Sequence, residues 1–199
     1  MGRRLARLRE YLRLSRSDEI ARRYFVINGF DGALAILGVI TGAFIVGAAE
    51  PRIIISAGFG ASLAMGVSGA WGAYMAERAE RTRRLKDLQE ALFTDLSKTV
   101  LERASAAAAL TVAMVDALSP VLTSAITLAP FVLALFGIIP STVALVSALV
   151  LNAATLFLMG VFLGRLSRTS MIRYGTLMVL PGIVTIVLVL LLRVAPPAT

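Results

Sequence analysis

An uncharged, largely apolar run from Ile53 to Ala76 limits most strongly how this chain can fold. About 20 consecutive apolar residues are enough for a helix to cross the ~30 Å hydrocarbon layer of a bilayer. The run is also rich in small residues, and four of them recur at every fourth position: Gly58, Ser62, Gly66 and Ala70. This spacing places them on one helix face, where a neighbouring backbone can approach closely. The run therefore predicts a membrane-spanning helix that packs tightly against others.

The composition of the whole chain agrees with this prediction. Of its 199 residues, 58% are hydrophobic and the mean hydropathy is +0.84, so the chain is more apolar than a soluble domain of this size. There is no Cys and no His, which excludes disulfides, thiolate or imidazole metal sites and catalysis by Ser-His or Cys-His pairs. No other nucleophile–base pair or cofactor motif is present, so we expect neither an enzyme nor a resident cofactor.

Four further apolar runs are long enough to cross a membrane. They cover residues 24–49, 106–138, 141–163 and about 174–192. We therefore predict an all-α integral membrane protein with five transmembrane helices in one domain, residues 24–192. Residues 1–23 are basic and amphipathic, which fits either a helix on the membrane surface or a loosely ordered tail, and they do not resemble a cleaved leader. Residues 193–199 form a short tail.

The Lys and Arg residues lie mainly on one side of this arrangement. Membrane proteins keep such residues in their cytoplasmic segments. If the N-terminus is inside, the segments expected in the cytosol hold 18 of the 20 Lys and Arg, and only Arg52 and Arg193 lie outside. This distribution predicts an N-in, C-out, multi-pass protein among membrane lipids, which we expect in a prokaryotic cell membrane. Topology thus explains the net charge of +8, and we expect no nucleic-acid partner.

One polar segment, residues 77–105, separates the second and third apolar runs. In it Leu85, Leu88, Leu92 and Leu96 recur every three or four residues, as on an amphipathic helix. We expect the second helix to extend into the cytosol as one long helix, and a short helix to return toward the membrane. The segment holds six acidic and seven basic residues, which makes it a poor reservoir for cations.

Asp31 is an acid inside the first apolar run, between Gly29 and Gly32. A carboxylate within a span is costly and usually serves an ion or proton path. The two glycines are expected to let the helix loosen, so that backbone carbonyls face an ion. The alternative is a structural acid bonded to Asn28 or to a neighbouring helix.

Met65 lies in the middle of the Gly- and Ser-rich run. Its thioether is a soft ligand, which suits a transition metal better than Mg²⁺ or Ca²⁺. It precedes Glu77 by 12 residues, or ~18 Å along a helix, so we expect Met65 and Asp31 at nearby depths on adjacent antiparallel helices. The alternative is that Met65 only fills the core.

Asp116 is a second acid in an apolar run. Pro120 has no N–H, so the carbonyl of Asp116, four residues earlier, is expected to lose its helical partner. A freed carbonyl and a carboxylate on one residue suit a proton or cation site inside the membrane. If the third span begins only at Ser119, Asp116 is interfacial instead.

Several of these residues lie in longer stretches that resemble a known family. The segments INGFDGALAILGVITG (27–42) and SLAMGVSGAWGAYMAERAE (62–80) are similar to the first two helices of the vacuolar iron transporter family. The segments LAPF (128–131), LMGVFLGRLSRTS (158–170) and MIRYGTLMVLPG (171–182) are similar to its third, fourth and fifth helices. The resemblance covers most of residues 24–192.

The resemblance implies a five-helix homodimer that exchanges Fe²⁺ or a similar divalent ion for protons. Asp31 would match the family's translocation-path aspartate, and Met65 its path methionine. Glu77 and Glu80 would fall where the second helix enters the cytosol with metal-collecting glutamates. The plainer alternative for these two glutamates is i,i+4 pairing with arginines on a solvated helix.

We therefore expect proton-coupled transport of Fe²⁺ or Mn²⁺-like ions out of the cytosol. The expected metal contacts are Asp31, Met65, Glu77, Glu80 and Asp116, with proton coupling at Asp31 and Asp116. A further family glutamate is replaced here by Ala57, and Asp116 is a candidate to replace that acid in part. The alternative function is a non-transporting membrane scaffold or partner subunit, whose Gly and Ser faces serve only helix packing.

Overall fold

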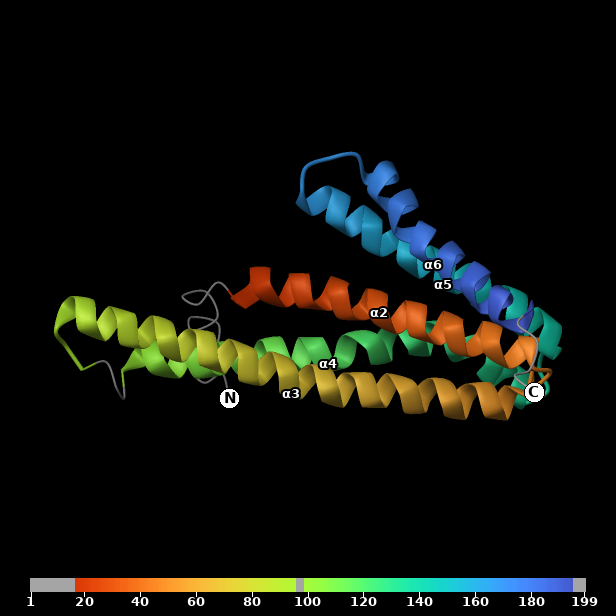
Figure 1. Cartoon of the computed structure of the whole chain (residues 1–199), viewed down its shortest axis with the longest axis horizontal. Helices are drawn as coiled ribbons and strands as arrows, with labels where there is room; N and C mark the ends of the chain where they lie inside the picture. The colour runs from red at the N-terminus through yellow and green to blue at the C-terminus, as the bar shows by residue number, and fades with distance from the viewer. Residues whose placement is uncertain (1–16, 96–98, 195–199) are drawn as a thin grey trace. The chain divides into compact units, whose positions relative to one another are not determined.

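The structure is a computed structural model that describes residues 17–95 and 99–194, so most of the predicted surface segment and the tail lie outside it. The regular structure in the described residues is helical (Figure 1). The helices are α2 (Ser17–Ile45), α3 (Pro51–Leu92), α4 (Val100–Leu135), α5 (Ser141–Leu166) and α6 (Met171–Val194). Each of these five described helices is long and apolar enough to cross a membrane. The chain is thus an all-α, multi-pass membrane protein.

The polar segment is built differently from what its sequence predicts. Helix α3 is one helix of 42 residues, so the second apolar run does continue unbroken into the polar segment. Within the described residues of this connection there is no separate short helix, because residues 100–105 already form the first turns of α4. Helix α4 continues through Pro120 and Pro130, which neighbouring helices make tolerable in a membrane.

Two glycines set the ends of α2 and α4. Gly47 and Gly137 have φ angles of 77° and 72°, a left-handed conformation that glycine adopts without strain. After each glycine the backbone turns back, with Ala48 N–H donating to Ala43 O and Ile138 N–H donating to Leu133 O. These bonds satisfy carbonyls that the ending helix leaves free. The first helix therefore ends at Ile45, four residues earlier than the apolar run predicts.

The chain divides into two compact units. The first unit comprises Met1–Phe25 and Gly66–Leu118, and the second comprises Val26–Met65 and Ser119–Thr199. Helices α2, α3 and α4 each contribute to both units, whereas α5 and α6 belong to the second. In the first unit, a small core joins three helices through Ala21, Ala73, Val112 and Ala113.

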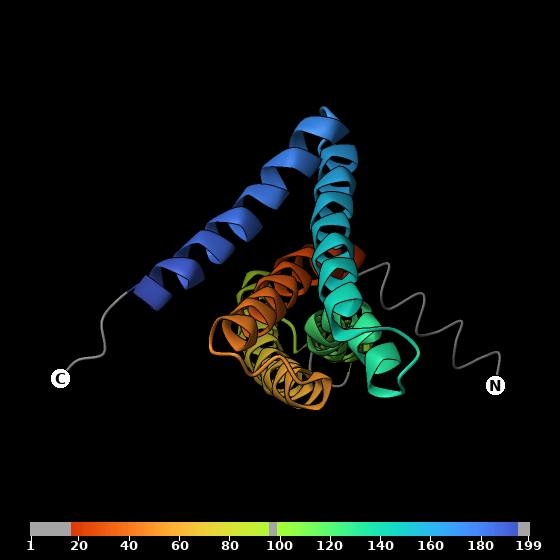
Figure 2. The ribbon, with the colours of Figure 1, turned by 90° about the vertical axis from the view of Figure 1, so that its right-hand side faces the viewer.

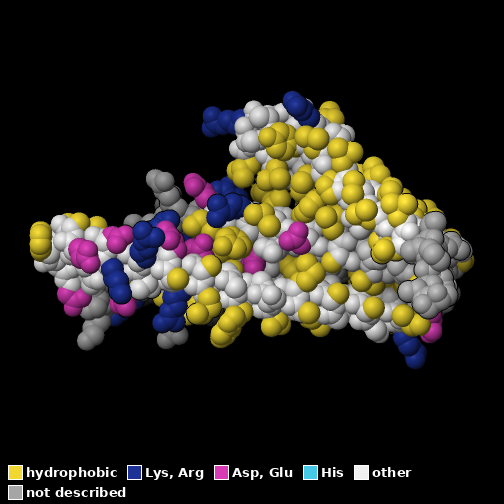
Figure 3. Space-filling model, viewed as in Figure 1, with side chains coloured by type: hydrophobic (Ala, Val, Ile, Leu, Met, Phe, Trp, Pro, Cys, Tyr) yellow, Lys and Arg dark blue, Asp and Glu magenta, His cyan; other side chains and the backbone are white. Residues whose placement is uncertain are grey.

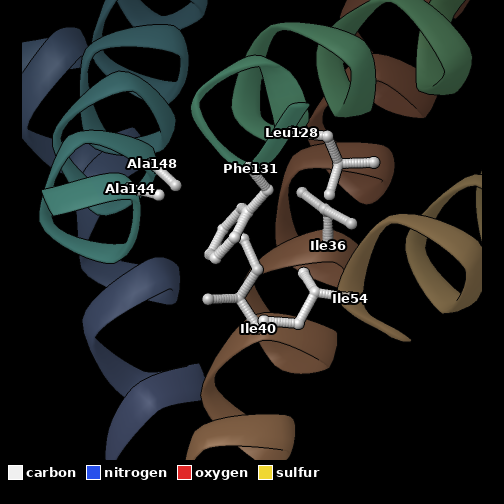
Figure 4. Packing of buried hydrophobic residues seen from close by; sticks show 7 residues of the cluster. All are labelled: Ile36, Ile40, Ile54, Leu128, Phe131, Ala144 and Ala148. Carbon is white, nitrogen blue, oxygen red and sulfur yellow. The ribbon is translucent and has the colours of Figure 1, made fainter. Parts of the chain in front are cut away.

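The core of the second unit is built from four helices (Figure 4). Its buried members are Ile36 and Ile40 of α2, Ile54 of α3, Leu128 and Phe131 of α4, and Ala144 and Ala148 of α5. The branched and aromatic side chains from α2, α3 and α4 fill the space between them. The two alanines let the backbone of α5 come close to Phe131.

Helices α5 and α6 form a hairpin that is tight at its connection and opens away from it (Figure 2). Close to the connection, an added Cβ at Gly160 would meet the backbone of Tyr174 and Gly175. The outer surface of this hairpin is strongly apolar (Figure 3). Arg165, Arg168 and Arg173 lie at or next to its connection in the sequence. Large side chains along α6, such as Ile183 and Leu188, are more than half exposed. Such a surface is stable in lipid and not in water.

Candidate ion-binding residues

Asp31 lies on a regular stretch of α2, and the neighbouring glycines have a packing role. An ideal Cβ at Gly32 would be 2.5 Å from Pro120 Cα, so only glycine lets α4 approach this closely. The carbonyl of Gly32 accepts a hydrogen bond from Ser124 Oγ at 3.4 Å. The expectation that Gly29 and Gly32 loosen the helix is wrong, since α2 is unbroken from Ser17 to Ile45.

The carboxylate of Asp31 points away from this packed face. Asp31 is exposed, and it forms no hydrogen bond or ion pair with any residue of 17–95 or 99–194. Positions seven and eleven residues later, Gly38 and Gly42, lie on the same face of α2. No described atom lies within 4 Å of a Cβ added at either glycine. Asp31 thus belongs to an open helix face with room for another helix.

Met65 lies on α3 in the second unit, the unit that also contains Asp31. It is half-buried, between the buried residues Ser62 and Gly66 and the exposed residues Leu63 and Ala64. Gly58 and Ser62 face the interior: a Cβ at Gly58 would touch Leu128, and Ser62 Oγ donates to Gly58 O at 2.7 Å. Part of the small-residue face therefore packs inside the protein, as its spacing predicts.

Glu77 and Glu80 are both paired with arginines one turn later on α3. Glu77 Oε2 is 3.2 Å from Arg81 Nε, and both side chains are about nine-tenths buried. Glu80 Oε1 is 2.9 Å from Arg84 Nε, and this pair is open to solvent. The i,i+4 pairing considered as the plainer alternative is thus formed at both glutamates, so a metal ion there must compete with an internal cation.

Asp116 is only 3% exposed and lies on α4 in the first unit. Its Oδ2 atom would be 2.6 Å from a Cβ added at Gly69 of α3, so this glycine makes room for the carboxylate. Asp116 is thus a buried acid of the first unit that lies against Gly69 of α3.

The predicted site residues do not form one carboxylate cluster. Among the described residues, no three Asp or Glu side chains converge in a way that could hold a metal ion. Asp31 and Met65 belong to the second unit, whereas Glu77, Glu80 and Asp116 belong to the first.

Sequence reasoning missed a polar group that joins α2, α4 and α5 in the second unit. Asn152 Nδ2 donates to Ala33 O at 2.8 Å and to Thr127 Oγ1 at 3.2 Å, while its buried Oδ1 has no hydrogen-bond partner in the described ranges. Thr123 and Ser119 continue this buried polar line along α4. The sequence did contain a signal for this group, because Asn152 is an amide in an apolar run and Ser119, Thr123 and Thr127 recur every four positions on α4. Burying an amide is costly unless it is hydrogen-bonded, so an Asn in such a run predicts a polar partner on another helix.

Comparison with known proteins gives a full-length relative. The chain is 32% identical over 182 residues to "Uncharacterized protein MJ0645" of Methanocaldococcus jannaschii, covering 90% of this chain and 92% of that protein. The chain belongs to the family of MJ0645. No family model matches the chain, and no solved structure matches it. The coverage means that the MJ0645 family shares most of the helical region, including parts of both units.

Proposed function

We propose that this protein transports divalent transition-metal ions, Fe²⁺ or Mn²⁺-like, out of the cytosol in exchange for protons. The observation that carries the proposal is Asp31, an exposed carboxylate on an apolar helix with no polar partner among the described residues. Placing a charged Asp in the middle of a span costs about 2.5–3.5 kcal/mol on insertion scales. This insertion cost is smaller if the carboxylate faces water, an ion or a partner protein instead of lipid.

The resemblance to the vacuolar iron transporter family gives the remaining parts of the proposal. Met65 supplies a soft thioether in the same unit as Asp31, and such a ligand favours a transition metal over Mg²⁺ or Ca²⁺. Glu77 and Glu80 contact the incoming ion at the cytosolic end of the spanning part of α3, in competition with Arg81 and Arg84. Protons bind Asp31 and Asp116 as the metal leaves.

The open faces of α2 and α3 support a homodimer through these two helices. On α3 a second row of small residues is exposed: Gly60, Ala64, Ser68 and Gly72. Nothing described lies within 4 Å of a Cβ added at Gly60 or Gly72. Small residues at this spacing let two membrane helices approach closely.

Cysteine crosslinking tests the dimer, since the chain contains no Cys of its own. We expect Ser68→Cys and Ala64→Cys to form disulfide-linked dimers when membranes are oxidised. The control is Val187→Cys on α6, which is also exposed but lies on an ordinary apolar surface. Equal crosslinking at all three positions, or none at the α3 positions, would contradict this interface.

The charge distribution supports N-in, C-out orientation in a prokaryotic cytoplasmic membrane. An alkaline phosphatase fused to the C-terminus is then active, because the enzyme works only outside the cytosol, and a green fluorescent protein fused there is dark. The same two reporters inserted in the α5–α6 connection, after Ser167, are expected to behave in the opposite way. A fluorescent C-terminal fusion would reverse the proposed orientation.

The rival function is a non-transporting scaffold, and the packing roles of Gly32 and Gly58 favour it. Purified protein in liposomes that contain a metal-sensitive dye separates the two functions. We expect uptake of Mn²⁺ and Fe²⁺ well above that of protein-free liposomes, with little uptake of Mg²⁺. If none of these ions moves faster than in the protein-free control, the scaffold is the better account.

A further inference from the structure

A hollow of about 300 Å³ lies between α3 and α4 in the first unit. This volume is at the lower end of the range for small-molecule sites. Three of its lining residues are basic, Arg78, Arg81 and Lys86, whereas Glu102 is its one acid. The two helices run antiparallel along this part of the unit, so a molecule in the hollow would contact both (Figure 1).

Arg81 is the most unusual residue of this hollow. Its side chain is only 10% exposed, and its Nε atom is 3.2 Å from Glu77 Oε2. Its Nη2 atom is buried and has no hydrogen-bond partner within the described part of the chain. A buried donor without an acceptor destabilises the fold, and more so when the group is charged. The guanidinium therefore lacks one acceptor, and Arg81 also forms part of the wall of the hollow.

The other cations of the wall are placed to assist Arg81. Arg78 is held by a hydrogen bond from its Nη1 to the Tyr74 hydroxyl at 2.8 Å, and its guanidinium lies 5.8 Å from the centre of that ring. Lys86 lies two turns further along α3 and lines the same hollow. Since Glu77 already balances Arg81, the remaining lining charges, Arg78 and Lys86 against Glu102, still leave an excess of positive charge. This wall attracts an anion and repels a metal cation.

We propose that the hollow binds a phosphate group, carried either by a lipid headgroup or by a soluble phosphate compound. Arg81 and Arg78 each supply a guanidinium group to the wall, and Lys86 supplies a point charge. Guanidinium groups suit phosphate because their N–H groups form paired, charge-assisted bonds with its oxygens. A bound phosphate would join α3 to α4 and stabilise the first unit in proportion to its occupancy. The site does not depend on the transport proposed above.

Binding is measured on the full chain in two ways. In neutral detergent, inorganic phosphate is added at constant ionic strength and the thermal unfolding midpoint is recorded, with chloride as the reference salt. In lipid nanodiscs, native mass spectrometry counts the phosphatidylglycerol molecules that stay bound, with phosphatidylcholine as the reference lipid. We expect at least one of these ligands to bind, and Arg81→Gln and Arg78→Gln each to weaken that binding by at least about 10-fold, as loss of a charge-assisted bond of 1.5–3 kcal/mol implies.

The matched control is Arg103→Gln, an exposed α4 residue that removes the same charge and does not line the hollow. Arg78→Gln guards against misfolding, since Arg78 is exposed whereas Arg81 is buried. Retention of phosphatidylglycerol without phosphate binding identifies a lipid headgroup, and the reverse identifies a soluble ligand. The proposal is overturned if neither ligand binds, or if Arg103→Gln weakens binding as much as the two pocket variants do. None of these readouts involves metal flux, so failure of transport leaves the test intact.

Discussion

Asp31→Ala is expected to reduce Mn²⁺ uptake into proteoliposomes by at least about 10-fold. The variant removes the one carboxylate that the described part of α2 presents on its open face within the apolar span. Loss of a residue that only hydrogen-bonds to a metal ligand typically lowers metal affinity or activity by roughly 10–100-fold, so loss of a ligand itself should cost at least as much. Because Asp31 is exposed and forms no hydrogen bond or ion pair within the described residues, the variant should fold as the wild type does.

Two further variants make this result specific. Met65→Ala is expected to lower uptake of Mn²⁺ and Fe²⁺ as well, because it removes the soft ligand. The control is Asp87→Asn, which removes an exposed acid from the polar part of α3. Unchanged uptake in both Asp31→Ala and Met65→Ala would end the transport proposal, and an equal loss in Asp87→Asn would show that the assay reports surface charge.

Gly32→Ala is expected to destabilise the second unit by about 1–3 kcal/mol, the usual range for overpacking. Its Cβ would lie 2.5 Å from Pro120 Cα and 2.7 Å from Thr123 Oγ1, and the nearer of these atoms belongs to the backbone. The α2–α4 contact must therefore open, which also strains the bond between Gly32 O and Ser124 Oγ. A lower midpoint in the loss of helical circular dichroism on heating in detergent checks this result.

The control for this substitution lies ten residues away on the same helix. Gly42→Ala adds the same atom where nothing described lies within 4 Å, so stability should be unchanged or should rise by up to about 1 kcal/mol from helix propensity. If both variants have the same midpoint, the close approach of α2 to Pro120 is not what stabilises the unit.

The helices could be predicted from the sequence because each apolar run carries its own signal of length and composition. Their ends were less predictable. Helix α2 ends at Ile45, just before Gly47, whose backbone has a left-handed conformation. Helix α4 begins at Val100, within the amphipathic segment 77–105, although the residues before Val100 follow the same amphipathic pattern. A local pattern cannot tell two short helices from the ends of two long ones.

The site residues show the same limit. The spacing of Glu77 and Arg81 allowed both ion contact and pairing, and only the folded α3 shows that the pair forms. Gly32 allows the close approach of Pro120, which lies far away in the sequence. The residues next to Gly32 do not reveal this contact, so the sequence alone predicted a flexible point in the helix instead. Asn152 was missed because its partners, Ala33 on α2 and Thr127 on α4, lie 119 and 25 residues away in the sequence.

The central claim is tested most directly by measuring metal and proton movement together in one set of proteoliposomes. Liposomes that hold wild-type protein, a metal-sensitive dye and a pH-sensitive dye are prepared with an acidic interior, and Mn²⁺ is added outside. The account predicts that Mn²⁺ enters faster than in liposomes without a pH gradient, and that its entry makes the interior more alkaline. Mn²⁺ entry without any change in internal pH, or a pH change that does not depend on Mn²⁺, would contradict metal–proton exchange.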